Sequence, residues 1–193
     1  VAAQHPLIDG LYPNEEFENR LLRAIQLYED LKLQGVEVEF YVPGSVHIFE
    51  GVQDKIALTI AGTNFLLEKG IDPAIIHGED LNNKYKGEDG VYNSADECFV
   101  TASYFKDGNF GRLITVESPI QLTRKDFHYL YFGVWPMQHT APALRTFHSP
   151  VKESYVDVPY VRDIDPGCQT IAPGTYAWTT RMDRMPGFKE KHQ

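Results

Sequence analysis

Two short polar segments of this chain have the residue types and the spacing of helix starts that can bind ligands. Ser94 is followed three residues later by Glu97, and Ser118 is followed three residues later by Gln121. This is the spacing of a capping box, in which the hydroxyl accepts a hydrogen bond from a first-turn amide and the Glu or Gln reaches back. Free amides and the positive end of the helix dipole also attract anionic groups. Both segments are therefore predicted to begin helices and are candidate ligand-binding sites.

Polar side chains at these starts also suit ligand binding, and Asn93 and Asp96 are not needed for a cap. Asn93 and Asp96 supply an amide and a carboxylate, groups that suit recognition of a ribose or an amine. Ser118, Gln121 and Arg124 together can hold a phosphate or a carboxylate by charge-assisted hydrogen bonds. The plainer interpretation is an ordinary helix cap with a surface arginine. No Gly-x-Ser-x-Gly surrounds Ser118, which argues against a covalent nucleophile there.

Further candidates lie in loops that follow predicted strands. His5 follows one such strand, and Ser45 and His47 follow another, while Glu79 opens a polar loop over residues 78–91. A histidine at a shared sheet edge can transfer protons near neutral pH. Glu79 can bind a ribose hydroxyl or a cationic group. Structural histidines and a solvated loop carboxylate are the competing interpretations, and the remaining histidines lack metal-site spacing, so no metal is expected.

The apolar pattern places these groups on alternating helices and strands. A first helix starts at Asn14 and is closed by Gly35, and later helices are predicted over about 53–69, 95–106 and 119–131. Short apolar segments predict strands over 36–42, 74–77, 112–116 and 133–136. The chain opens on Val1-Ala2-Ala3 as if within a strand near its end, which leaves room for a further segment before it. This alternation predicts a doubly wound, mainly parallel five-stranded α/β sheet flanked by helices.

The character of the chain changes after this core. Residues 1–145 are expected to form the Rossmann-like α/β domain, and residues 146–193 a C-terminal extended or β arm packed on it. The arm has several prolines, short alternating segments and no helical period. Its tyrosine and tryptophan content argues against free disorder.

Composition and charge exclude several classes of function. The chain has 193 residues and a net charge of −9, which does not suit nucleic-acid binding because phosphate contacts need basic patches. No apolar run approaches the roughly 18 residues of a membrane span, and no signal peptide is visible, so we expect a cytoplasmic protein with no membrane contact. Two cysteines, Cys98 and Cys168, are too few for a disulfide framework.

The order of these motifs resembles that of the YdcF/SanA/ElyC family, a bacterial family long described as a domain of unknown function. The resemblance covers residues 17–134 and is carried by Asn19-Arg20, by the segment from Asn93 to Glu97 and by the segment from Val116 to Arg124. The resemblance implies a Rossmann-like fold and a link to bacterial envelope processes. One branch of that family is reported to bind S-adenosylmethionine, so the resemblance also implies this molecule as a ligand.

The chain departs from the family's pattern at three places. Glu97 replaces the final Asn of the third-helix motif, and Gln121 occupies a position that is usually His. The glycine pair typical of the first strand is absent near Ala3. The arginine that follows in the family is kept as Arg124.

The leading hypothesis is a small-molecule-binding α/β enzyme, either a transferase or a hydrolase. Its ligand would be anionic, nucleotide-like, phosphorylated or related to S-adenosylmethionine, and would lie at the carboxyl edge of the sheet. The expected ligand- or cofactor-binding residues are Ser45, Glu79, Asn93, Ser94, Ser118, Gln121 and Arg124. The expected catalytic residues are His5, His47 and Asp96.

A rival hypothesis is a non-catalytic interaction module with a degenerate site, which uses the aromatic arm to contact a partner. Under either hypothesis the arm could also mediate a homodimer.

Overall fold

The structure, a computed structural model, describes residues 1–140 apart from 4–5, 50, 109, 118–121 and 135–137. Helices and short strands alternate along the described chain, so the predicted mixed α/β class is confirmed. The helices are α1 (Glu15–Leu33), α2 (Leu58–Glu68), α3 (Glu79–Lys86), α4 (Ser94–Asp107) and α5 (Leu122–Tyr131), with short 3₁₀ turns η1 (Pro73–Ile75) and η2 (Gly87–Asp89). The strands are β1 (Phe40–Tyr41), β2 (Ile48–Phe49), β3 (Val52–Gln53), β4 (Ile76–His77), β5 (Ile114–Val116) and β6 (Gln138–Thr140).

Two parallel strand pairs lie at the centre of the fold. β1 pairs with β4, with Phe40 opposite Ile76, and β5 pairs with β6, with Ile114 opposite Gln138. A separate antiparallel hairpin joins β2 to β3. Parallel pairs need crossover connections, and here the helices provide them.

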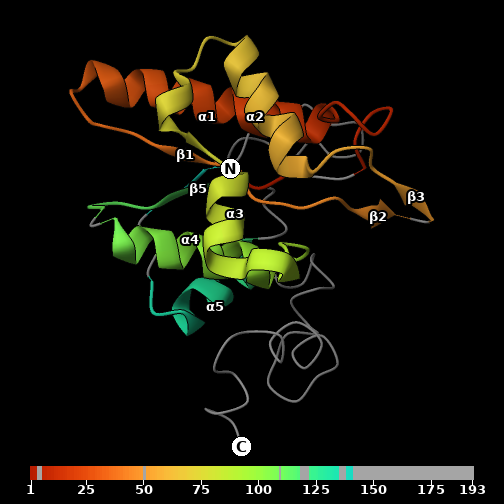
Figure 1. Cartoon of the computed structure of the whole chain (residues 1–193). Coiled ribbons are helices and arrows are strands. Elements are labelled where there is room, and N and C mark those ends of the chain that lie inside the picture. Colours follow the sequence, from red (N-terminus) through yellow and green to blue (C-terminus); the bar gives the residue numbers. More distant parts are fainter. Residues whose placement is uncertain (4–5, 50, 109, 118–121, 135–137, 141–193) are drawn as a thin grey trace, which may run out of the picture.

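Residues 1–3 link the two parallel pairs. The backbone nitrogen of Val1 lies 2.6 Å from the carbonyl oxygen of Tyr41 in β1. The next amide, that of Ala2, donates to the carbonyl of Val116 in β5 at 2.8 Å. Figure 1 shows this first segment of the chain between β1 and β5.

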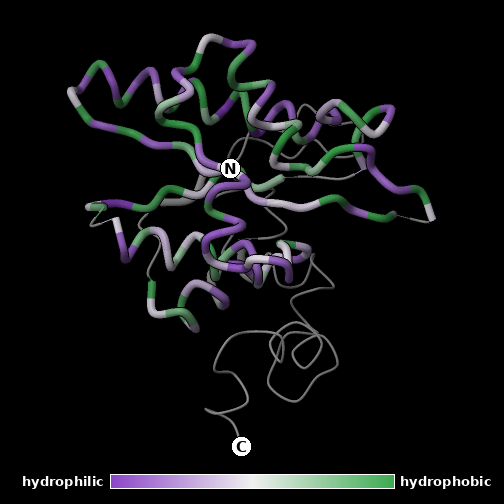
Figure 2. Tube along the Cα trace, in the orientation of Figure 1, coloured by the Kyte–Doolittle hydropathy of each residue, from purple (hydrophilic) through white to green (hydrophobic). Residues whose placement is uncertain are grey.

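Helices cover both sides of the strands. In Figure 1, α1 and α2 lie above them and α3, α4 and α5 lie below. Apolar and polar residues alternate along α1 in Figure 2, as expected for a helix with one face on the core. The main core cluster joins α1, α2 and the strands through Phe17, Leu21, Phe40, Val42, Leu58, Leu66 and Val116. A second cluster on the other side contains Tyr41, Leu81, Val91 and Val100.

The first helix begins as predicted. Asn14 is its N-cap, and the Asn14 side chain accepts a hydrogen bond from the amide of Phe17 at 2.9 Å.

Close packing of the second helix rests on a glycine. A Cβ atom at Gly62 would lie 2.7 Å from Val42 and 2.8 Å from Phe17, so α2 approaches β1 and α1 only because this residue lacks a side chain.

One predicted element is wrong, and two others are shorter than predicted. Residues 78–91, predicted as a loop, contain α3 and η2. The second helix begins at Leu58 rather than near residue 53, because the preceding residues form the β2–β3 hairpin. The strand predicted over 36–42 is regular only at Phe40–Tyr41.

The C-terminal predictions fall largely outside the described part of the chain. Residues 133–134 are not in a strand, residues 135–137 lie outside the described residues, and the last described strand is β6. The arm predicted over 146–193 also lies outside them. Within the described residues, no helix combines the length and the apolar character needed to cross a bilayer.

Candidate functional site

The loop after β1 lies against the segment that leads into α4. The amide of Ser45 donates to the carbonyl of Val91 at 2.8 Å, and the amide of Val91 donates to the Ser45 hydroxyl, also at 2.8 Å. Beside this clasp, the rings of His47 and Tyr92 meet edge to face with centroids 6.1 Å apart. Two of the predicted site segments, Ser45–His47 and the start of α4, are therefore neighbours.

A glycine sets the course of the loop after β1. Gly44 has a φ of 116°, a conformation that favours glycine. A Cβ at this position would also lie 2.9 Å from the Leu58 side chain at the start of α2. The loop is therefore fixed between α2 on one side and the clasp with Val91 on the other.

The cap of α4 lies one residue before the predicted one. Asn93 is the N-cap, and its side-chain oxygen accepts from the amides of Ala95 at 2.9 Å and Asp96 at 3.1 Å. The helix begins at Ser94, so the prediction that Ser94 and Glu97 form the capping box is wrong. Asn caps a helix as well as Ser does. The amide of Glu97, which a Ser94 cap would bind, here donates to the backbone carbonyl of Asn93 at 3.0 Å.

The Asp96 side chain also binds residues around the start of α4. One carboxylate oxygen accepts from the Tyr92 amide at 3.1 Å and from the Asn93 side-chain amide at 2.7 Å. The other lies 3.1 Å from the ammonium of Lys86 at the end of α3, and both side chains of this ion pair are 4% exposed. The Asp96 side chain therefore positions the start of α4 and joins α3 to α4.

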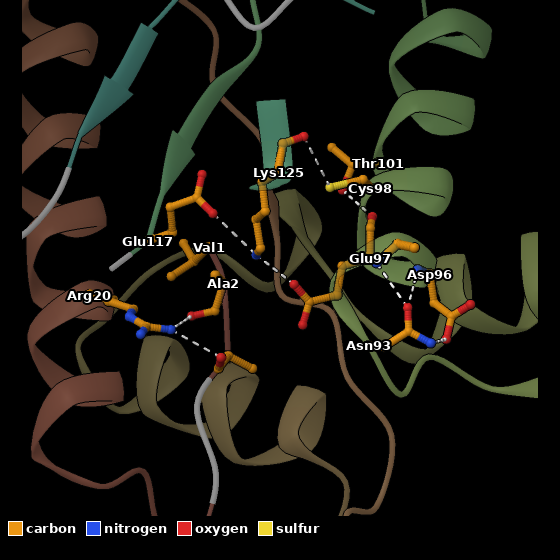
Figure 3. Close-up of polar contacts among 12 residues, drawn as sticks. Val1, Ala2, Arg20, Asn93, Asp96, Glu97, Cys98, Thr101, Glu117 and Lys125 are labelled. Carbon is orange, nitrogen blue, oxygen red and sulfur yellow. Dashed lines mark hydrogen bonds and ion pairs between the residues drawn. The ribbon is translucent and has the colours of Figure 1, made fainter. Parts of the chain in front are cut away.

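Glu97, which takes no part in the helix cap, belongs to a buried ionic cluster (Figure 3). The ammonium of Lys125 on α5 lies 2.6 Å from Glu97 and 3.4 Å from Glu117, the residue that directly follows β5. Glu117 is fully buried and Lys125 is 3% exposed. We call Glu97, Glu117 and Lys125 the carboxylate–lysine cluster.

The electrostatics of this cluster keep the lysine charged. Burial alone would lower the pKa of Lys125, but the carboxylates of Glu97 and Glu117 outweigh it and raise the pKa above its ordinary value. Lys125 is therefore a fixed cation rather than a nucleophile.

The neighbouring cysteine does not suit nucleophilic chemistry. Cys98 is fully buried on α4, and its thiol contacts the Lys125 carbonyl at 3.8 Å. Burial raises the pKa of this thiol well above its ordinary value, so it stays protonated at neutral pH.

A buried arginine holds the carboxyl end of residues 1–3. Arg20 on α1 is fully buried, and its Nη1 donates to the carbonyls of Ala2 at 3.2 Å and Ala3 at 3.0 Å. Its other terminal nitrogen forms an ion pair with Glu16 one turn earlier. Figure 3 shows Arg20 and Glu117 on opposite sides of the first residues of the chain.

The other predicted site residues are placed as follows. Glu79 is the exposed first residue of α3, where Asp80 rather than Glu79 contacts the Gly78 amide at 2.7 Å and His77 at 3.0 Å. Arg124 lies on α5, with its side chain outside the description. His5, Ser118 and Gln121 lie outside the described residues, so the capping box proposed for Ser118 stays a prediction.

Sequence reasoning missed several residues of this site. Glu117, Lys125, Lys86 and Arg20 were not candidates, yet all four are buried charges with partners. One signal was available for Lys125. It precedes the buried His128 and Tyr129 by three and four residues, which places it on the buried face of α5.

Comparisons with protein-family models, with curated proteins and with solved structures found no match. Over the described residues, no three His, Cys, Asp or Glu side chains are grouped as a metal site would require. Any statement about function therefore rests on the residues and contacts given above.

Proposed function

We propose that this protein binds a small nucleotide-like molecule, with S-adenosylmethionine among the candidates, and acts on it as a transferase or hydrolase. The observation that supports this is the clasp between Ser45 and Val91, which joins the loop after β1 to the start of α4. In open α/β sheets, ligands bind in the crevice at the carboxyl ends of the strands. The clasp lies at this end of β1.

The proposal includes the arrangement of the strands. Residues 1–3 would form the central strand of a five-stranded doubly wound sheet, in the order β4, β1, residues 1–3, β5, β6. Two hydrogen bonds support it, from the nitrogen of Val1 to Tyr41 and from the amide of Ala2 to Val116. The loop after β1, Glu117 after β5 and the residues after Ala3 would then meet at one edge. This is also the arrangement implied by the resemblance to the YdcF/SanA/ElyC family.

Each part of such a ligand has a suitable group near the clasp. The paired rings of His47 and Tyr92 offer an aromatic surface for a base, and Tyr92 is 45% exposed. Asn93 and Ser94 are half-buried and suit the ribose hydroxyls. The carboxylate of Glu97, which is 16% exposed, suits a cationic or hydroxyl-bearing group.

The remaining roles extend the same proposal. Ser118, Gln121 and Arg124 would hold an anionic part of the ligand. His47 and His5 would be the proton-transfer groups. Asp96, which is bound by Lys86 and Asn93, would position the helix start instead.

Calorimetric titration tests the proposal. S-adenosylmethionine, AMP and ATP are titrated into the full chain, and at least one should bind. Tyr92→Ala should then weaken that binding by about tenfold or more, because stacking of a base on an aromatic ring contributes about 1–3 kcal/mol. Tyr12→Ala, at another exposed tyrosine on a different segment, is the matched control. No binding by any of the three ligands, or equal loss in both variants, would refute this site.

One observation favours the rival, non-catalytic module. The charged groups at the start of α4 are already neutralised, because Lys86 pairs with Asp96 and Lys125 pairs with Glu97. Under this reading the site is a structural relic, and the arm over residues 146–193 contacts a partner or a second copy. Light scattering on the full chain, together with failed titrations, would support the module by showing a dimer without a ligand.

A further inference from the structure

A long cavity lies between β1 and β5, beside the first residues of the chain. Its volume is about 570 Å³, and its two long walls are residues 36–41, which lead into β1, and residues 110–117, which contain β5. Val1 and Ala2 also line it. In Figure 1, the segments that lead into β1 and into β5 extend to the left on either side of the amino end. We call this cavity the slot.

The slot passes between the two helical layers. On one side it is lined by Ala24, Leu27, Tyr28 and Leu31 of α1, and on the other by Thr101, Tyr104 and Phe105 of α4 and Tyr129 of α5. A pocket for a small molecule usually opens at a loop edge, whereas this one lies between two parallel strands and two helix layers. In a sheet that is covered by helices on both faces, a central strand occupies this position.

The backbone of both walls faces the slot in a defined register. Backbone groups of a strand point alternately to its two neighbours. The amide of Val42 donates to His77 on the β4 side, so Tyr41 and Glu39 face the opposite side, where Tyr41 already accepts from the nitrogen of Val1. By the same alternation, Val116, which accepts from Ala2, shares its side of β5 with Ile114 and Arg112.

From this geometry we infer that the slot holds an extended strand of polypeptide joined to the nitrogen of Val1, parallel to β1 and β5. The first residue before Val1 would donate to the carbonyl of Ile114. The second would donate to the carbonyl of Glu39 and accept from the amide of Tyr41. At about 3.3 Å per residue, the five residues 36–40 provide a wall for a strand of similar length.

The walls specify the kind of strand that fits. Side chains of a strand alternate between its two faces, and here one face meets Ala24, Tyr28 and Leu31 while the other meets Thr101 and Tyr104. Both faces are covered, so the occupant should be a nearly continuous run of β-branched and apolar residues. A polar residue fits only at the far end, near Val36, which is 45% exposed.

A strand explains the slot better than an apolar small molecule does. An apolar ligand would leave the carbonyls and amides along both walls without partners, and buried backbone groups are almost always paired. A strand continuous with residues 1–3 satisfies both walls with the register already present at Val1 and Ala2. This inference concerns the fold and does not depend on the proposed ligand.

The test compares three forms of the full chain. One carries Lys-Ile-Val-Val-Ile before Val1, and the second carries Lys-Ile-Val-Pro-Ile, in which proline removes the amide expected to donate to Glu39. The third carries a Gly-Ser-Gly-Ser-Gly extension as the length control. Melting temperature and amide hydrogen exchange are measured on each.

The apolar extension should raise the melting temperature by roughly 10 °C or more over the Gly-Ser control, because it buries several apolar side chains. The amides of Tyr41 and Ile114 should exchange about tenfold or more slowly in that form. The proline form should show neither effect in full. Equal stabilisation by the proline form, or no change with the apolar extension, would overturn the inference. So would stabilisation by the same peptide added as a separate molecule but not by the joined extension.

Discussion

The ammonium group of Lys125 lies 2.6 Å from a carboxylate oxygen of Glu97, and this contact joins α5 to α4. The same ammonium lies 3.4 Å from Glu117 at the end of β5. The side chains of Lys125 and Glu117 are nearly removed from water, and that of Glu97 is 16% exposed. One cation therefore holds together the two helices and the strand that meet here.

Replacing this cation should be strongly destabilising. Lys125→Met removes the cation that contacts the buried carboxylates of Glu97 and Glu117, so we expect a loss of about 3–5 kcal/mol in the free energy of unfolding. Urea denaturation measures it. The control is Lys69→Met, at an exposed lysine at the end of α2, which should cost less than about 1 kcal/mol. Similar losses in both variants would show that the cluster adds nothing to stability.

The cap of α4 can be assigned by two alanine substitutions. Asn93→Ala removes the side chain that binds the amides of Ala95 and Asp96, and should cost about 1 kcal/mol, within a range of about 0.5–2 kcal/mol. Ser94→Ala, at the first helical residue, should change the stability by less than about 0.5 kcal/mol. Chemical denaturation of both variants gives the comparison. The reverse order of losses would restore Ser94 as the cap.

Alkaline pH should destabilise the protein through buried tyrosines. Burial, with nearby carboxylates, raises the pKa of Tyr41 well above its ordinary 10.0, and its hydroxyl donates to Asn82 at 2.6 Å. The unfolded chain ionises near pH 10 while the folded chain does not. The stability contributed by this group is therefore complete below pH 10 and is lost as the pH rises above it.

Tyr41→Phe tests this pH dependence directly. The variant should be about 1–3 kcal/mol less stable at neutral pH, because Asn82 loses its partner. Above pH 10, its stability should fall less steeply than that of the parent chain, by up to about 1.4 kcal/mol per pH unit. Denaturation from about pH 9 to about pH 11 measures both slopes. Tyr12→Phe, at an exposed tyrosine, should leave the slope unchanged, and an unchanged slope in Tyr41→Phe would contradict the prediction.

The first residues of the chain should depend on Arg20. Arg20→Met removes two hydrogen bonds to the carbonyls of Ala2 and Ala3, each worth about 1.5–3 kcal/mol with a charged donor. We expect a large loss of stability and faster hydrogen exchange at the amide of Ala2. Arg23→Met, one turn further along α1 and half-buried, is the control and should leave that exchange unchanged. Unchanged exchange in both variants would show that Arg20 does not hold residues 1–3 in place.

The alternation of helices and strands could be predicted because it depends on local patterns. Asn14 at the start of α1 and the apolar spacing that follows are local signals, and the structure places that helix as predicted. The helix α3 was missed because its eight residues contain few apolar positions. Acidic residues in its first turn and lysines in its last turn favour a helix through the dipole, and that signal was present in the sequence.

The candidate site was harder to predict because capping and ion pairing use the same residue types. Ser94 and Glu97 fit a capping box by spacing alone, but Asn93 one residue earlier is an equally good cap. That shift of one residue changes the role of Glu97, which then pairs with Lys125, a residue 28 positions away. No local pattern shows such a partner.

The place of residues 1–3 also has a consequence for how the protein folds during synthesis. Ala2 pairs with Val116, so residues 1–3 cannot complete these hydrogen bonds until residue 116 has left the ribosome. Until then, the edges of β1 and the apolar face of α1 remain exposed. Long-range parallel pairing of this kind is slow and open to aggregation. We therefore expect this pairing to form late in translation, with the emerging segment between residues 1 and 116 dependent on chaperones.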